Sequence, residues 1–218
     1  MRRGAWAWAI GFACVGCKPA ARSAPSEAGA LAVEAGVVPE VRLGEVENRR
    51  IFGGVTEEDI GHHEVAVRRR AARALSRLGG AASLPPLFTA LSDEDAEVVA
   101  WAAYGLGYVC RTETSSAGEI VKALSTRAAA LPASDGAALD PEFAVTRAIG
   151  RCATDEAEKV LETWLAGPRA RASYAALALG DIASKRKTLA QSTQLVFLTA
   201  ASSGLSNSPL AEALHPFG

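Results

Sequence analysis

Residues 91–110, LSDEDAEVVAWAAYGLGYVC, contain the start signal and the apolar face of a helix that decides the fold. Ser92 can cap this helix, and the negative charges of Asp93 and Glu94 are favourable beside its positive N-terminal end. Apolar and small side chains then recur at helical spacing, at Val98, Ala102, Gly105, Leu106 and Val109. Gly105 and Gly107 lower helix propensity but let a second helix approach closely. We therefore expect one helix of a tightly stacked array.

The ending of this helix recurs along the chain as a five-residue pattern. It reads small, branched apolar, small, variable, apolar, and it occurs as ALSRL (74–78), GLGYV (105–109), AIGRC (148–152) and ALGDI (178–182). The second residues, at positions 75, 106, 149 and 179, lie 31, 43 and 30 residues apart. Such a period is typical of a helical solenoid, because each unit buries its apolar face only by stacking on its neighbours.

Three fragments resemble HEAT repeats: VRRRAARALSRLG (67–79), LPPLFTALSDEDAEVVAWAAYGLG (84–107) and RASYAALALGDI (171–182). The resemblance extends over about residues 40–203. It implies an all-α fold, a right-handed α-solenoid of about four to five HEAT-like helix pairs, which we place at residues 37–205. HEAT arrays serve mostly as scaffolds with diverse partners, so the resemblance implies binding without naming a partner.

Prolines and capping residues mark the expected helix boundaries. We expect a first helix at 41–52, a loop at 53–64 and a second helix ending at 78, followed by helices at about 85–91 and 117–131. Residues 132–142 form an inserted loop that explains the longest spacing, and Asp140 caps the helix that Pro141 begins. Thr154 caps a helix to 166, and further helices follow at 168–183 and 188–201.

Composition and charge bound the function. With 49% hydrophobic residues and 20 glycines among 218, the chain is a globular type rather than a disordered one. A net charge of −1 and a pI near 6.3 argue against a general affinity for nucleic acid. We find no nucleophile elbow, phosphate-binding loop or zinc-protease motif, so we expect no catalysis and no cofactor.

The N-terminus predicts export. Residues 1–16 combine Arg2 and Arg3 with an apolar run too short to span a bilayer, as in a signal peptide. The segment CVGC (14–17) resembles a bacterial lipoprotein signal, which implies that Cys17 is lipidated, with Cys14 as a second candidate. A signal that is simply cleaved is the alternative.

The resemblance to lipoprotein signals also implies a place in the cell. Lys18 replaces the Asp that retains many such proteins at the inner membrane, so we expect the outer membrane more than the inner one. Residues 17–36 are rich in Ala, Ser, Pro and Gly, and predict a lipid anchor followed by a disordered linker. The expected location is the bacterial cell envelope.

Superposition of the repeats places arginines and aromatic residues side by side next to the apolar stripe of each second helix. Such residues dominate binding hot spots. Second helices line the concave surface of HEAT arrays, so we interpret this ridge as a groove for a protein or peptide. The alternative is structural, with arginine stems and rings that only cover apolar neighbours. The residues are Arg70, Arg73, Arg77, Trp101, Tyr104, Tyr108, Arg147, Arg151 and Tyr174.

Histidines and cysteines offer two further hypotheses. His62 and His63 lie among acidic residues, but adjacent residues point to different faces and a third ligand is missing, so we expect a solvated loop and no metal. Cys110 and Cys152 end neighbouring second helices. Because packed helices lie about 8–10 Å apart and a disulfide needs Cα atoms within about 7 Å, we expect buried thiols, and a disulfide, which export would permit, is the alternative.

The favoured function is a non-catalytic scaffold of the cell envelope that binds a protein or peptide. Residues 206–218 form a tail without a convincing polar cap for the solenoid, so we expect a product shorter than its relatives. Some lipoproteins with a similar start and HEAT array continue into a cyclophilin-type prolyl isomerase. The alternative is therefore the arm of an isomerase whose catalytic domain is missing. A HEAT-type lyase subunit for a chromoprotein is a weaker alternative, because the export signal opposes it.

Overall fold

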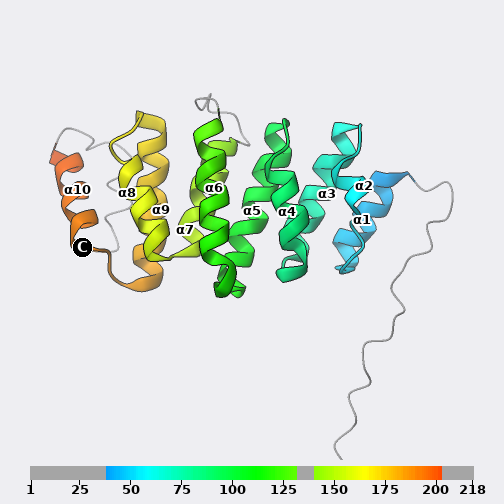
Figure 1. Ribbon diagram of the computed structural model, residues 1–218, viewed down its shortest axis with the longest axis horizontal. Helices are drawn as coiled ribbons and strands as arrows, with labels where there is room; N and C mark the ends of the chain where they lie inside the picture. Colours follow the sequence, from blue (N-terminus) through cyan, green and yellow to red (C-terminus); the bar gives the residue numbers. More distant parts are fainter. Residues whose placement is uncertain (1–37, 132–139, 203–218) are drawn as a thin grey trace, which may run out of the picture. The chain divides into compact units, whose positions relative to one another are not determined.

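The computed structural model describes residues 38–131 and 140–202, and these residues are helical almost throughout (Figure 1). The all-α fold expected from the sequence is confirmed. The described part contains ten α-helices: α1 (Pro39–Arg49), α2 (Glu57–Ile60), α3 (Val65–Leu78), α4 (Leu84–Leu91), α5 (Ala96–Thr112), α6 (Ala117–Ala130), α7 (Pro141–Cys152), α8 (Asp155–Trp164), α9 (Arg169–Arg186) and α10 (Gln191–Ser202).

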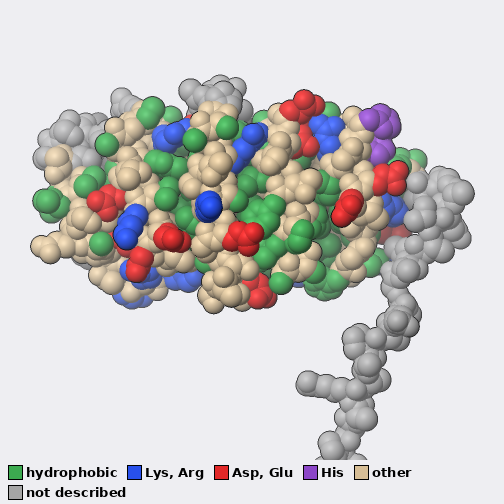
Figure 2. Space-filling view, in the orientation of Figure 1, with side chains coloured by type: hydrophobic (Ala, Val, Ile, Leu, Met, Phe, Trp, Pro, Cys, Tyr) green, Lys and Arg blue, Asp and Glu red, His purple; other side chains and the backbone are tan. Residues whose placement is uncertain are grey.

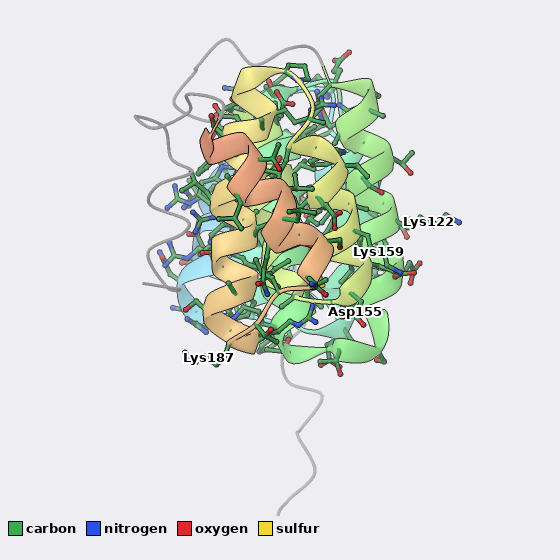
Figure 3. All side chains as sticks on the ribbon, turned by 90° about the vertical axis from the view of Figure 1, so that its left-hand side faces the viewer. Lys122, Asp155, Lys159 and Lys187 are labelled. Atoms are coloured by element: carbon green, nitrogen blue, oxygen red, sulfur yellow. A yellow bond between two sulfur atoms is a disulfide. The ribbon has the colours of Figure 1, made fainter. Side chains whose placement is uncertain are left out.

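The helices form two rows. Helices α1, α3, α5, α7 and α9 pack on one another in sequence, and we call them the second-helix row. Helices α2, α4, α6, α8 and α10 form the first-helix row. Figure 3 shows the rows from the α10 end, with Lys122 of α6 and Lys159 of α8 on the first-helix side. Neighbours contact each other far more extensively in the second-helix row, which makes it the inner side of the array.

The recurring five-residue pattern explains this close packing. The third residue of each pattern meets the first residue of the next, where a helix backbone approaches so closely that one member must be small. A methyl group on Gly107 would lie 2.8 Å from Cα of Ala148, which is closer than packed carbon atoms approach. The corresponding distances are 2.9 Å from Gly105 to Cα of Ser76, and 2.7 Å from Gly150 to the carbonyl oxygen of Ala178. The small residues of the pattern therefore set the distance between second helices.

The start of the array differs from the expectation. The helix expected at 41–52 as the first member of the first pair is α1, and α1 packs along α3 in the second-helix row. The expected loop contains α2, which takes the first-helix place. A capping box begins α2, in which the Thr56 hydroxyl accepts from the Asp59 amide at 3.3 Å and the Asp59 carboxylate accepts from the Thr56 amide at 2.8 Å. The spacing of Thr56 and Asp59 is the sequence signal for α2 that the expectation of a loop overlooked.

Helix caps are partly as expected. Asp95, rather than Ser92, caps α5, because its Oδ1 accepts from the amides of Glu97 and Val98 at 3.1 Å each. Ser92 is the C-terminal cap of α4 instead. Asp140 caps α7, as its Oδ1 accepts from the Glu142 amide at 2.8 Å. Thr154 caps α8, with its hydroxyl 3.1 Å from the Ala157 amide.

Several expectations fall outside the described residues. These are the signal at 1–16, Cys17 and Cys14, the linker at 17–36, the tail at 206–218 and most of the inserted loop at 132–142. Within residues 38–131 and 140–202, no helix has both the length and the apolar content that a membrane span requires.

Candidate binding site

A disulfide joins Cys110 at the end of α5 to Cys152 at the end of α7. The expectation of buried thiols was wrong, although both residues are buried as expected. The reasoning compared the distance between helix axes with a distance between Cα atoms. Because Cα atoms lie about 2.3 Å from the helix axis, facing Cα atoms are several ångströms closer than the axes. Here the two Cα atoms are 4.9 Å apart, one turn beyond the close approach at Gly107.

Beside this disulfide, three aromatic residues of α5 form a ridge on the second-helix face. Trp101, Tyr104 and Tyr108 follow one another at helical spacing, and we call them the aromatic ridge. The two tyrosines are 42% and 39% exposed, which is unusual for large rings in a helix with a buried apolar face. Trp101 is half-buried and contacts Tyr104 edge-on, with ring centres 6.1 Å apart. The ridge therefore offers ring surface to solvent.

An arginine cluster on α3 lies on one side of the ridge. Arg70, Arg73 and Arg77 all face the buried carboxylate of Glu47 on α1, at 3.5, 3.2 and 3.1 Å. A single carboxylate is thus shared by three guanidinium groups. The guanidinium of Arg73 also lies 5.5 Å from the ring centre of Trp101. Glu47 holds the cluster in place and leaves an excess of positive charge.

Two arginines of α7 lie on the other side. Arg147 pairs with Asp181 of α9 at 3.0 Å, and its guanidinium lies 5.8 Å from the ring centre of Phe143. Arg151 stacks over Tyr104 at 4.6 Å. Burial is the main cause that lowers the pKa of Arg151 from its usual value, and the positive charge of Arg147 adds to it. Among the described residues, no carboxylate lies within ion-pair distance of Arg151.

Two hollows meet at the ridge, and both are lined by Trp101 and Tyr104. The first, about 400 Å³, lies between α5 and α7, and its other lining residues are Ala100, Asp140, Phe143, Ala144, Arg147 and Arg151. The second, about 470 Å³, lies towards α3 and is lined also by Arg50, Ser76, Arg77 and Tyr108. The structure therefore brings the expected ridge residues of three neighbouring helices into one continuous surface, which we call the second-helix groove.

Tyr174 has a different place from the other expected ridge residues. Its hydroxyl donates to Oδ2 of Asp140 at 2.9 Å, and its ring contacts Phe143 edge-on at 5.0 Å. It supports the N-terminus of α7 and does not line either hollow. Three groove residues were missed, namely Arg50, Glu47 and Phe143. Phe143 could have been found from the sequence, because the superposition of the repeats aligns this large ring with the small residue Ala100.

The first-helix side also has a hollow. It measures about 670 Å³, lies between α4 and α6, and is lined by Phe88, Leu91, Ala123 and Ala130 among others. Figure 2 shows apolar side chains exposed between these helices. This surface combines Lys122 and Arg127 with Glu119, and so has a smaller positive excess than the second-helix groove.

His62 and His63 line none of these three hollows. His62 and His63 stack on each other with ring centres 4.4 Å apart, and the Nε2 atom of His63 lies 3.6 Å from Glu64. Both side chains belong to the turn before α3, and His63 is largely exposed. Within the described part of the chain, no three metal-ligating side chains come together.

Comparisons with known proteins concern the fold. Residues 59–132 match the family of HEAT repeats. A crystal structure of an engineered protein superposes with a TM-score of 0.55 at 20% identity, covering 84% of this chain and 90% of that one. The complex of CpcE and CpcF of the phycocyanin lyase from Nostoc sp. PCC7120 gives a TM-score of 0.48 at 19% identity, with 91% and 92% covered. No curated protein sequence matches the chain.

Proposed function

We propose that this chain, a HEAT-repeat helical solenoid, is a non-catalytic scaffold that binds a protein or peptide along the second-helix groove. Exposed aromatic rings between two groups of arginines are the observation that carries the proposal. Such side chains combine a large contact area with directed hydrogen bonds, which is why they dominate binding hot spots. The first-helix row supplies the opposite, more mixed surface.

The proposal places the scaffold in the bacterial cell envelope, held by a lipid on Cys17. The signal-like N-terminus supports export. The Cys110–Cys152 disulfide supports it independently, because structural disulfides form and persist in oxidising compartments outside the cytoplasm. The anchor and the linker at 17–36 would then let the array reach partners near the membrane surface.

Photo-crosslinking in living cells tests the binding surface without knowledge of the partner. The photoreactive residue p-benzoylphenylalanine is placed at position 108, in the groove, and at position 122, on the opposite row. We expect discrete crosslinked protein bands from position 108 that are absent from position 122. Equal bands from the two positions, or none from position 108 in the native host, would contradict binding through the groove.

A further inference from the structure

We propose that the hollow between α5 and α7 binds an acidic peptide segment, with a carboxylate on Arg151 and a neighbouring apolar side chain against Trp101 and Phe143. The inference rests on the proposed function and names its partner's chemistry. Three features of the described residues carry it: the local charge, the state of Arg151 and the apolar walls.

The charge of the groove is opposite to that of the whole chain. The net charge of the chain is −1, yet six arginines lie along the groove: Arg50, Arg70, Arg73, Arg77, Arg147 and Arg151. The carboxylates among them are already engaged. Glu47 faces three arginines, Asp181 pairs with Arg147, and Asp140 accepts from backbone amides and from Tyr174. The positive excess therefore remains available to an anionic partner.

Arg151 is the residue where an anion gains most. Its guanidinium is partly desolvated by burial and lies over the ring of Tyr104, and no carboxylate of the described residues lies within ion-pair distance, since Asp181 acts on it only from farther away. A carboxylate from a partner would restore the lost interactions through two parallel N–H···O bonds. Contact with the ring of Tyr104 restricts the side chain of Arg151 before a partner binds, which reduces the entropy lost on binding.

The walls of the hollow favour a peptide over a bare anion or a nucleic acid. Ala100, Trp101, Phe143 and Ala144 supply an apolar lining next to the two arginines of α7. A volume of about 400 Å³ accommodates one large apolar side chain beside a carboxylate. Nucleic-acid binding instead requires a run of cations along a phosphate backbone, and this face has acidic residues interspersed with its arginines.

Fluorescence anisotropy with designed peptides tests the proposal on the full chain. The probe is a fluorescein-labelled 12-residue Gly/Ser peptide with a central phenylalanine flanked by two glutamates on each side. One control peptide replaces the glutamates by glutamine, a second replaces phenylalanine by alanine, and oligothymidine of equal length represents nucleic acid. The protein variants are Arg151→Gln, Arg151→Lys and, as a matched loss of one charge from the first-helix row, Lys122→Gln.

We expect the acidic peptide to bind at least tenfold more tightly than either control peptide or oligothymidine. Arg151→Gln should weaken binding about tenfold or more, because a charge-assisted bidentate contact is lost. Arg151→Lys should lie between it and the wild type, and Lys122→Gln within twofold of the wild type. Circular dichroism checks that each variant is folded.

Equal binding of the acidic and the glutamine peptides, or an Arg151→Gln variant with wild-type affinity, would overturn the inference. So would tighter binding of oligothymidine. Crosslinks from position 108 together with any of these results would leave the scaffold function standing and remove only the acidic partner. Absence of crosslinks from position 108 would contradict the scaffold function, whereas the anisotropy results alone decide the acidic partner, because Tyr108 does not line the hollow between α5 and α7.

Discussion

Reduction of the Cys110–Cys152 disulfide should destabilise the array by several kcal/mol. The bond joins α5 to α7 and closes a loop with a sequence separation of 42 residues, which contains the whole of α6. When the bond is broken, the unfolded chain gains the conformational freedom of that loop. The folded chain changes little, because both cysteines remain buried between closely packed helices.

The size of the effect follows from the length of the loop. For 42 residues, the chain-entropy relation gives an entropy difference of about 13 cal/mol/K, or about 4 kcal/mol at 25 °C. Residual structure in the reduced, unfolded chain lowers this figure, so we expect about 2–4 kcal/mol. At a typical urea dependence of about 2 kcal/mol/M, the unfolding midpoint should fall by about 1–2 M urea.

Urea unfolding followed by circular dichroism measures this shift. The protein should carry Cys14→Ser and Cys17→Ser, so that the pair is the chain's only source of thiols. Mass spectrometry before and after reduction and alkylation should show two protected cysteines becoming reactive. The double variant Cys110→Ala/Cys152→Ala is the control and should not respond to reductant. Free thiols in protein from an oxidising compartment, or a midpoint that reduction leaves unchanged, would refute the reasoning.

Three further predictions concern the helices. Gly107→Ala should destabilise the fold by about 1–2 kcal/mol because its methyl group meets the backbone of α7. Gly118→Ala on the exposed side of α6 should be neutral or stabilise by up to about 1 kcal/mol, and thermal melts compare the two. Arg69 donates hydrogen bonds to Asp95 and thereby lowers the pKa of Asp95, so this carboxylate stabilises the fold above about pH 4 and loses the effect as pH falls through its folded pKa. Asp95→Asn should therefore cost about 0.5–1 kcal/mol at pH 7 and progressively less as the pH falls below about 4, as measured by urea unfolding at a series of pH values. Glu158 is buried against Arg186 and the α10 residue Thr193. Glu158→Ala should therefore loosen α10, so that hydrogen exchange of the α10 amides becomes rapid whereas the α3 amides stay protected.

The repeated pattern predicted the fold because its small residues lie where neighbouring second helices approach each other closely. Small residues at its first and third positions are required where second helices meet backbone to backbone, as at Gly107 and Ala148. Such a constraint is local in sequence and repeats with the helices, so it can be read without a structure. The place of α1 was not readable in this way, because only packing along α3 assigns a lone helix to one row or the other.

The arrangement of residues along the proposed groove was predictable in part for the same reason. Superposed repeats place equivalent residues on one face, and in the structure Arg151 lies over the ring of Tyr104. The sequence could not show which side chains of different helices form ion pairs or hydrogen bonds with one another. Glu47 lies on α1, which lacks the repeated pattern, and its carboxylate faces three arginines of α3. The hydroxyl of Tyr174 donates to Asp140, away from the groove. These contacts depend on side-chain direction and on distances between helices.

A close backbone approach and the disulfide coincide at one junction, between α5 and α7, and the hollow proposed for the partner lies at the same junction. A solenoid otherwise bends easily, because each repeat contacts only its neighbours. A covalent link at the C-terminal ends of both helices limits their relative motion and so holds Tyr104 on one wall against Arg151 on the other. A preformed hollow binds with less loss of entropy than a flexible one. The disulfide is therefore expected to influence affinity as well as stability, and reduction should weaken binding of the acidic peptide even under conditions in which the array stays folded.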